Sequence, residues 1–228
     1  MRRFAVTFLV LILLGISAAL FAKFTPYVDV DVAMRIAFIE KKDPILMFSS
    51  DSCYYCKKFK SEAFVNETVE KLLNANFVFV EVFYNKLKKT TAFGEELDYG
   101  QLFQMFGVRG TPTFWFLTEA GTPVTYLPGY VPPDTFSKIL RYMAQELYKK
   151  EVEFSKYAEG EDDYMGTPLI LTVSQEDAEF VLEKDPLAVR IDSLPKVVDP
   201  FKVYVTSDRS LAEKLLEKGV YRILFVEG

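Results

Sequence analysis

The fold is decided by one stretch of the chain, Pro44-Ile45-Leu46-Met47-Phe48-Ser49-Ser50-Asp51-Ser52-Cys53-Tyr54-Tyr55-Cys56. Residues 45–48 form a short apolar run followed by a polar turn, which is typical of a buried strand. From Cys53 onward, apolar side chains recur at helical spacing, at Phe59, Ala63 and Phe64. The sequence therefore predicts that Cys53 begins a helix directly after a strand.

A thiol at this junction is suited to disulfide exchange. It faces unpaired backbone N–H groups and the positive end of the helix dipole, which favour the thiolate. The thiolate is both the nucleophile and the better leaving group in exchange. Because Cys53 is first on the helix and nearer solvent, we expect it to attack a substrate disulfide. Cys56, one turn further in, is expected to resolve the mixed disulfide.

Other uses of the cysteine pair have less support. A disulfide across two intervening residues closes a very short loop, so as a structural staple it would stabilise little. A metal site built on two cysteines needs further ligands. Covalent haem needs a histidine after the second cysteine, where this chain has Lys57.

Composition excludes most other chemistry. The 228 residues include no histidine and only two cysteines, which excludes Ser-His-Asp and Cys-His catalysis, histidine-ligated haem and four-cysteine metal sites. The formal net charge is −5 and no long basic run is present, so nucleic-acid binding is not expected. We expect no metal and no cofactor beyond the redox-active disulfide Cys53–Cys56 itself.

The N-terminus has the composition of an export signal. Met1, Arg2 and Arg3 precede an uncharged apolar stretch over residues 4–22, with small-residue cleavage sites near its end. The stretch is also long enough to remain as an N-terminal membrane anchor. Both interpretations place the rest of the chain outside the cytoplasm, in the periplasm or cell envelope, with membrane contact only through residues 1–22.

The remaining pattern is that of a mixed α/β protein in two parts. Helices are predicted at 29–40 and 97–106 and from Pro132 onward, and strands at 77–83, 113–117 and 124–127. Residues 23–150 are assigned to one domain and the charged residues 151–166 to a linker. The pattern of residues 167–228 predicts the order strand, helix, strand, strand, helix, strand, and we assign these residues to a small α/β domain.

The first domain resembles the thioredoxin-like superfamily. The residues that carry the resemblance are Pro44-Ile45-Leu46-Met47-Phe48, Cys53-Tyr54-Tyr55-Cys56-Lys57, Val108-Arg109-Gly110-Thr111-Pro112-Thr113 and Gly129-Tyr130. It is most similar to exported and envelope members, such as the DsbD C-terminal domain and SoxW-like thioredoxins.

The resemblance implies a thioredoxin fold, with a central mixed sheet flanked by helices, and thiol–disulfide exchange with protein disulfide or dithiol substrates. It implies a cis Pro112 lying against the cysteines, with Gly110 and the Thr111 backbone contacting the substrate. Tyr54 and Tyr55 are either further substrate contacts or ordinary ring packing.

Two positions depart from the family pattern. Thioredoxin carries a buried aspartate where this chain has Met47, and DsbD-type domains carry a glutamate where it has Lys60. The two acidic residues that assist proton transfer at the second cysteine in the family are therefore both missing at these positions. Glu81 is a candidate substitute, although an outward-facing glutamate on a strand is the commoner interpretation.

The residues between the two cysteines bear on the direction of exchange. No positive group separates the two cysteines, which favours a reductase of protein disulfides over an oxidase. A reductase would need a donor of electrons, such as a membrane thiol reductase. A disulfide oxidase or isomerase, and a non-catalytic redox-sensitive binding module, remain alternatives.

The C-terminal third resembles a degenerate rhodanese-like domain, on residues 173–192 and 203–228. The persulfide-forming cysteine of that family would fall at Tyr204 or Val205, which excludes sulfur transfer here. The following loop could present N–H groups to an anion, or Ser207 or Asp208 could simply cap the next helix. Docking or partner selection is the expected role.

Overall fold

A computed structural model describes residues 24–227, and residues 1–23 with the export-signal prediction lie outside this range. Its first sheet has the strand order β2 (Phe77–Phe83), β1 (Asp43–Ser49), β5 (Thr113–Leu117), β6 (Pro123–Pro128). Strand β1 runs parallel to β2 and antiparallel to β5, so the sheet is mixed. Within the described residues, no helix is long and apolar enough to cross a membrane.

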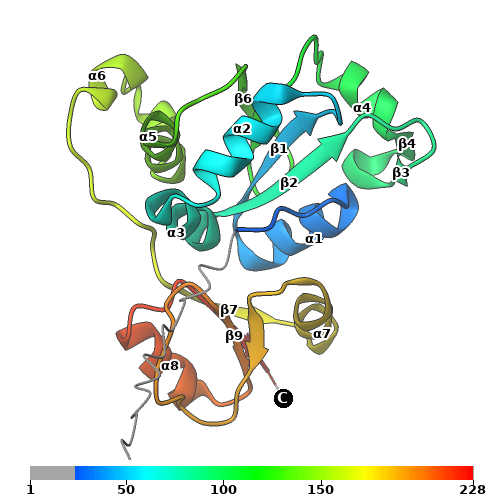
Figure 1. Ribbon diagram of the computed structural model, residues 1–228. Coiled ribbons are helices and arrows are strands. Elements are labelled where there is room, and N and C mark those ends of the chain that lie inside the picture. The colour runs from blue at the N-terminus through cyan, green and yellow to red at the C-terminus, as the bar shows by residue number, and fades with distance from the viewer. Residues whose placement is uncertain (1–23, 228) are drawn as a thin grey trace, which may run out of the picture.

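Helices cover both faces of this sheet (Figure 1). One face packs against α2 (Tyr54–Ala63), α3 (Glu67–Asn76) and α5 (Pro133–Ala144), and the other against α1 (Val30–Glu40) and α4 (Tyr99–Met105). The alternation of side chains along a strand produces this division. In β1, Ile45 and Met47 pack on the α2 side while Leu46 and Phe48 pack on the α1 side.

Local signals in the sequence placed most of these elements. The predicted strands 77–83 and 113–117 have those limits in the structure, and Asn66 caps α3 by accepting a hydrogen bond from the Val69 N–H (3.1 Å). The segment between β2 and α4 contains β3 (Lys89–Thr90), paired with β4 (Leu97–Asp98), and a short 3-10 helix, η1 (Ala92–Gly94).

The C-terminal region is a second, fully parallel sheet. Its strand order is β7 (Leu169–Val173), β10 (Arg222–Val226), β9 (Val203–Thr206), β8 (Ala188–Arg190). Two helices, α7 (Gln175–Lys184) and α8 (Arg209–Glu217), pack against it. This is the predicted order of elements, and it adds an α/β region to the thioredoxin fold.

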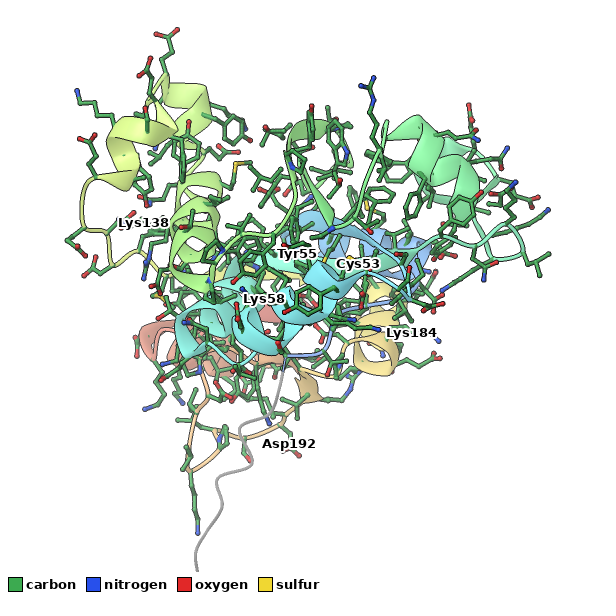
Figure 2. All side chains as sticks on the ribbon, turned by 45° about the horizontal axis from the view of Figure 1, so that its top comes forward. Cys53, Tyr55, Lys58, Lys138, Lys184 and Asp192 are labelled. Atoms are coloured by element: carbon green, nitrogen blue, oxygen red, sulfur yellow. A yellow bond between two sulfur atoms is a disulfide. The ribbon has the colours of Figure 1, made fainter. Side chains whose placement is uncertain are left out.

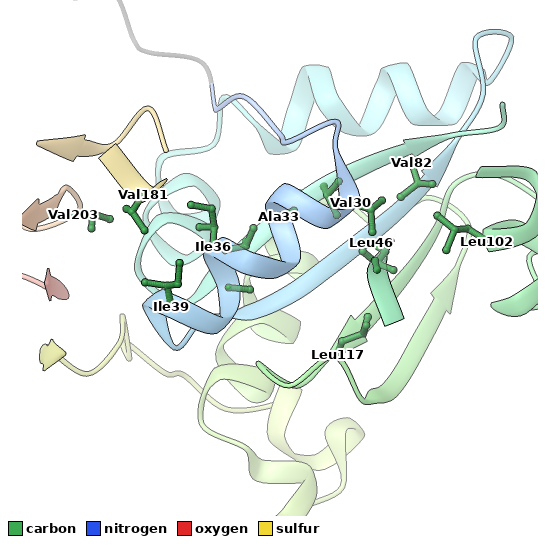
Figure 3. Packing of buried hydrophobic residues seen from close by; sticks show 14 of the residues in the cluster. Val30, Ala33, Ile36, Ile39, Leu46, Val82, Leu102, Leu117, Val181 and Val203 are labelled. Carbon is green, nitrogen blue, oxygen red and sulfur yellow. The ribbon is translucent and has the colours of Figure 1, made fainter. Parts of the chain in front are cut away.

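The two sheets share one helix, since α1 lies between them (Figure 1). Ile36 and Ile39 on α1 belong to the same hydrophobic cluster as Val181 on α7 and Val203 on β9 (Figure 3). Arg35 adds ion pairs to two acidic residues of α7. The hydrophobic core is therefore continuous from one sheet to the other.

The segment between the sheets is packed along part of its length. It contains the 3-10 helix η2 (Leu147–Lys150) and α6 (Phe154–Ala158). Tyr142 on α5 donates a hydrogen bond to the Val152 carbonyl (2.6 Å), and Arg141 Nε donates to the Tyr164 carbonyl (3.0 Å). These contacts tie the predicted linker to α5, while the proposed domain limits stay a prediction.

Asp43, at the start of β1, predicts a pH-dependent change in stability. Burial, and next the negative charge of Glu146, raise the pKa of its carboxyl to about 6. The folded state therefore holds a proton that the unfolded chain loses near pH 4, so this contribution is present at low pH and is lost as the pH rises through 6. Relative to wild type, Asp43→Asn should gain about 2 kcal/mol of unfolding free energy between pH 4 and 7.

Urea unfolding of both proteins across this pH range measures the difference. The exposed Asp31 on α1 provides a matched control, and Asp31→Asn should show no such trend. A difference between Asp43→Asn and wild type that stays constant with pH would contradict the assignment.

Candidate functional site

The cysteine pair lies where β1 leads into α2. Cys53 is the N-cap of α2, and its Sγ accepts a hydrogen bond from the backbone N–H of Cys56 (3.0 Å). The two cysteines form a disulfide. Cys53 is 8% exposed and Cys56 is 1% exposed, so a substrate reaches Cys53 first. After reduction, the same N–H group can stabilise a Cys53 thiolate, since charge strengthens such a bond.

The loop before β5 contacts the turn that precedes this pair, and it lines a cavity. The Thr111–Pro112 peptide bond is cis, as the resemblance implied. Thr111 Oγ1 lies 3.4 Å from Ser50 Oγ, which joins the loop to the turn that precedes Cys53. A cavity of about 530 Å³ lies along the loop and is lined by Gly110, Thr111 and Pro112 among others. These three predicted substrate contacts therefore share one concave surface.

Two aromatic residues of this cavity were missed by the sequence analysis. Trp115 on β5 and Tyr126 on β6 are paired across the two strands, and their rings stack with centroids 4.9 Å apart. Both line the cavity of the cis-proline loop. Alternation along 113–117 and 124–127 could have placed them on one face of the sheet, but only once the register of the two strands was known.

Exposed tyrosines lie beside the disulfide. Tyr54 is 70% exposed and Tyr55 is 55% exposed, and Figure 2 shows Cys53, Tyr55 and Lys58 together on α2. Tyr55 lies 6.2 Å from the ring of Tyr130, and the Lys58 ammonium lies 4.5 Å from that ring's centroid. Their packing is thus with surface neighbours, and most of both rings faces solvent.

Tyr130 is fixed by a charged partner. Its hydroxyl donates a hydrogen bond to the Glu62 carboxylate on α2, and this bond, with a smaller contribution from burial, raises the pKa of Tyr130 to about 12. Tyr130 therefore remains a neutral donor at physiological pH. The tyrosines Tyr54, Tyr55 and Tyr130 are called the aromatic surface below.

Glu81 is not the outward-facing strand residue that its position suggested. It is only 4% exposed, and both of its carboxylate oxygens accept hydrogen bonds from Lys60 Nζ at 2.8 Å. The commoner interpretation was wrong because β2 is covered on this face by α2, which sequence alternation alone does not reveal. Lys60, the other departure from the family pattern, is its partner.

A family model described as a thioredoxin-like domain matches residues 30–144. The chain belongs to the thioredoxin-like family. This domain holds the Cys53–Cys56 disulfide at the start of α2, and the protein is accordingly a thiol–disulfide oxidoreductase. Members of the family act on protein disulfide substrates.

Solved structures of the thioredoxin fold match about half of the chain. A thioredoxin from Thermus thermophilus is 28% identical, with a TM-score of 0.42 over 52% of this chain and 85% of that one. The DsbD C-terminal domain of Neisseria meningitidis in its oxidised form is 21% identical, with a TM-score of 0.38 over 56% of this chain and 100% of that one. No curated protein matches the chain.

The C-terminal region lies outside the matched residues, so its rhodanese-like resemblance stays a prediction. A cavity of about 580 Å³ lies at the carboxyl ends of β8 and β9 and is lined by Arg190, Ser207 and Asp208 among others. Asp208 caps α8 by accepting a hydrogen bond from the Leu211 N–H (3.1 Å). This is the plain capping role that was one of the two expectations for this loop.

The aromatic surface predicts a difference between large and small substrates of the thioredoxin-like domain. Replacing Tyr54 and Tyr55 together with alanine should raise KM for a protein disulfide about tenfold, because exposed aromatic rings contribute contact area with a partner. The rate with a small disulfide should stay within about twofold, since such a substrate reaches Cys53 without contacting the rings. Val65→Ala, at another exposed position after α2, is the control. An equal loss with both substrates would contradict a docking role.

Proposed function

We propose that the protein is an extracytoplasmic reductase of protein disulfides. In its reduced form, the Cys53 thiolate attacks one sulfur of a substrate disulfide and releases the other substrate sulfur as a thiolate. Cys56 then attacks Cys53 in the mixed disulfide, which releases the second substrate thiol and restores the Cys53–Cys56 disulfide. The observation that carries this proposal is the position of Cys53 at the N-cap of α2, where its sulfur accepts the Cys56 N–H.

The reducing direction is supported by the residues between the cysteines. Tyr54 and Tyr55 bring no positive charge to the Cys53 sulfur. A strongly stabilised thiolate makes the dithiol form more stable and the protein more oxidising. Without a positive residue between the cysteines, the Cys53 thiolate is stabilised less, which favours donation of electrons. A membrane thiol reductase is the proposed donor that returns the pair to its dithiol form.

The direction is tested by the reduction potential of the pair in the full chain, equilibrated with glutathione buffers. A potential near about −270 mV, as in thioredoxin, supports a reductase. A potential near about −120 mV, as in the oxidase DsbA, overturns this direction and favours a disulfide donor. A cysteine pair that does not exchange with glutathione would overturn both the reductase and the oxidase function. The non-catalytic binding module would then be the remaining alternative.

The location rests on the sequence of residues 1–22 and has a test of its own. A reporter enzyme that is active only outside the cytoplasm, fused after Gly228, should be active in cells that express the full chain. Replacing the apolar residues Leu9, Leu11 and Leu13 with charged residues should abolish that activity. An inactive reporter on the natural sequence would contradict the proposed location.

A further inference from the structure

Cys56 has to lose a proton in a place that water does not reach. The residue is 1% exposed, yet only its thiolate can attack the mixed disulfide. An apolar interior disfavours a thiolate, because burial destabilises the charged form of any acid. The resolving step therefore needs either a proton acceptor or a compensating charge inside the protein.

A charged pair lies on the same face of α2 as Cys56. Lys60 follows Cys56 by four residues, which places the two side chains one above the other on the helix. Side chains on a helix lean toward its N-terminus, so Lys60 extends back over the turn that holds Cys56. Its ammonium ends on Glu81, at 2.8 Å from both carboxylate oxygens.

Glu81 reaches this place from the neighbouring strand. In the parallel register of β1 and β2 it is the partner of Met47, near the end of β1 that leads to the cysteines. Its position in β2 alternates with Phe77 and Phe79, which lie in the cluster under α2. The carboxylate is therefore held beneath α2, among apolar side chains, and is 4% exposed.

The other charged groups of α2 and of the turn before it are directed elsewhere. Lys58 and Glu62 contact Tyr130, and Asp51 and Lys57 are exposed to solvent. The Lys60 ammonium also lies 5.5 Å from the centroid of the Phe83 ring on β2. The pair thus combines a buried carboxylate, Glu81, with a partly exposed positive charge, Lys60, on the face of α2 that carries the resolving cysteine.

We propose that Glu81 accepts the proton of Cys56 and that Lys60 holds its carboxylate in place for this step. The inference rests on the exchange reaction of the proposed function. The Cys56 S–H bond breaks and its proton passes to Glu81. The thiolate then attacks the Cys53 sulfur, the Cys53–Cys56 bond forms, and the bond from Cys53 to the substrate sulfur breaks. The leaving thiolate takes a proton from water, and Glu81 returns its own proton to solvent.

The ion pair suits this transfer better than a lone carboxylate would. Before the step, the negative charge of Glu81 balances Lys60. After it, Glu81 is neutral and the Cys56 thiolate balances Lys60 instead. The buried negative charge therefore keeps Lys60 as its partner on both sides of the step, which avoids the large cost of an unpaired buried charge.

The two steps can be separated with one small substrate. Reduced full-length protein, mixed with the aromatic disulfide dithiobis(nitrobenzoate), releases one coloured thiolate when Cys53 attacks and a second when Cys56 resolves the mixed disulfide. Glu81→Gln should leave the first release unchanged and slow the second at least about tenfold near neutral pH. The double variant Lys60→Met with Glu81→Gln, which leaves no ammonium without its carboxylate partner, should be equally slow in the second release.

Titration of the Cys56 thiol distinguishes a proton acceptor from a residue that only stabilises the fold. If Glu81 were only structural, its replacement would not change the ionisation of this thiol. In a Cys53→Ser background, absorbance of the Cys56 thiolate against pH gives its ionisation. Glu81→Gln should increase the acid dissociation constant of the thiol about tenfold, because a nearby negative charge is removed while Lys60 stays. A thiol that is more acidic yet resolves more slowly is the signature of a lost proton acceptor.

The buried pair of Glu40 and Lys42 is the matched control. Lys42 Nζ lies 2.7 Å from Glu40, and both residues are at the opposite end of β1 from the cysteines. Glu40→Gln with Lys42→Met should change stability but neither release. The proposal is overturned if Glu81→Gln leaves the second release within twofold of wild type, or slows both releases equally. A wild-type protein that shows no first release would instead overturn the proposed function.

Discussion

Replacing Cys53 with serine should abolish disulfide exchange, lowering its rate at least about a thousandfold. The expectation follows from the two exposures, since Cys53 is the sulfur that a substrate meets and Cys56 is buried behind it. A serine hydroxyl keeps the shape of the N-cap and can still accept the Cys56 N–H, so α2 should keep its first turn. The loss of exchange activity would therefore come from the missing thiol and not from a change in the fold. It is measured as the rate of reduction of a protein disulfide by the dithiol form.

Cys56→Ser is the matched variant, and its expected behaviour differs in kind. Cys53 can still attack, but nothing resolves the mixed disulfide, so the protein should accumulate as a covalent complex with its substrate. Mass spectrometry of the non-reduced mixture detects this adduct, which should be missing from Cys53→Ser. An adduct formed by Cys53→Ser and not by Cys56→Ser would reverse the assigned roles.

Trapping also identifies partners. Under the binding-module alternative, a partner would associate with Cys53→Ser as well as with the wild-type protein, and without any covalent bond. Under the proposed function, the substrate should be retained by Cys56→Ser in non-reducing gels and released by a reducing agent. The two cysteine variants therefore separate catalysis from simple binding.

The cysteine site was predictable because its signals are local. An apolar run, a polar turn and Cys53 at a helix start are contiguous in the sequence, and the structure places β1 and α2 on either side of that turn. The cis bond at Pro112 could be expected only through the resemblance, because the residues around it do not specify this isomer.

The contact between Lys60 and Glu81 could not be predicted in this way. They are 21 residues apart, and their contact depends on how α2 lies across the sheet. Strand alternation assigned Glu81 to one face of β2 but did not show that the face was covered. The residues at the two family positions, Met47 and Lys60, differ from the family pattern, but this difference alone does not show that Lys60 contacts Glu81.

The shared core was missed for a related reason. The sequence analysis assigned the helix 29–40 to the first domain alone, whereas α1 is covered by the first sheet on one side and by α7 and β9 on another. Ile36 and Ile39 therefore link two regions that the sequence analysis divided into separate domains. A helix with two covered sides differs little in sequence from one with a single broad apolar face.

Arg222 connects these regions by hydrogen bonds. This first residue of β10 is buried, and its guanidinium donates to the carbonyls of Glu40 (2.7 Å) and Lys41 (3.2 Å) at the end of α1. It also donates to the carbonyls of Tyr221 (2.7 Å) and Thr167 (3.3 Å) in the C-terminal region. A helix leaves its last carbonyls without partners, and here an arginine from the second sheet supplies donors to them.

Arg222→Met should consequently lower the free energy of unfolding by about 3 kcal/mol, because buried carbonyls lose charged donors that methionine cannot replace. Arg222→Lys should recover less than half of this loss, since an ammonium lacks the planar fork that reaches several carbonyls at once. Arg209→Met, which removes an exposed arginine paired with Glu213 on α8, should change stability by less than about 0.5 kcal/mol.

Urea unfolding followed by fluorescence of Trp115, in the first sheet, measures all three variants. Because the core is continuous through α1, the loss at Arg222 should appear as an earlier unfolding of the first sheet as well as the second. If the two sheets were independent, Arg222→Met would leave the Trp115 transition where wild type has it. That outcome would contradict a shared core and would favour a C-terminal region that unfolds by itself. An earlier Trp115 transition would instead make the second sheet part of the scaffold that holds α1 behind β1, the strand that leads to Cys53.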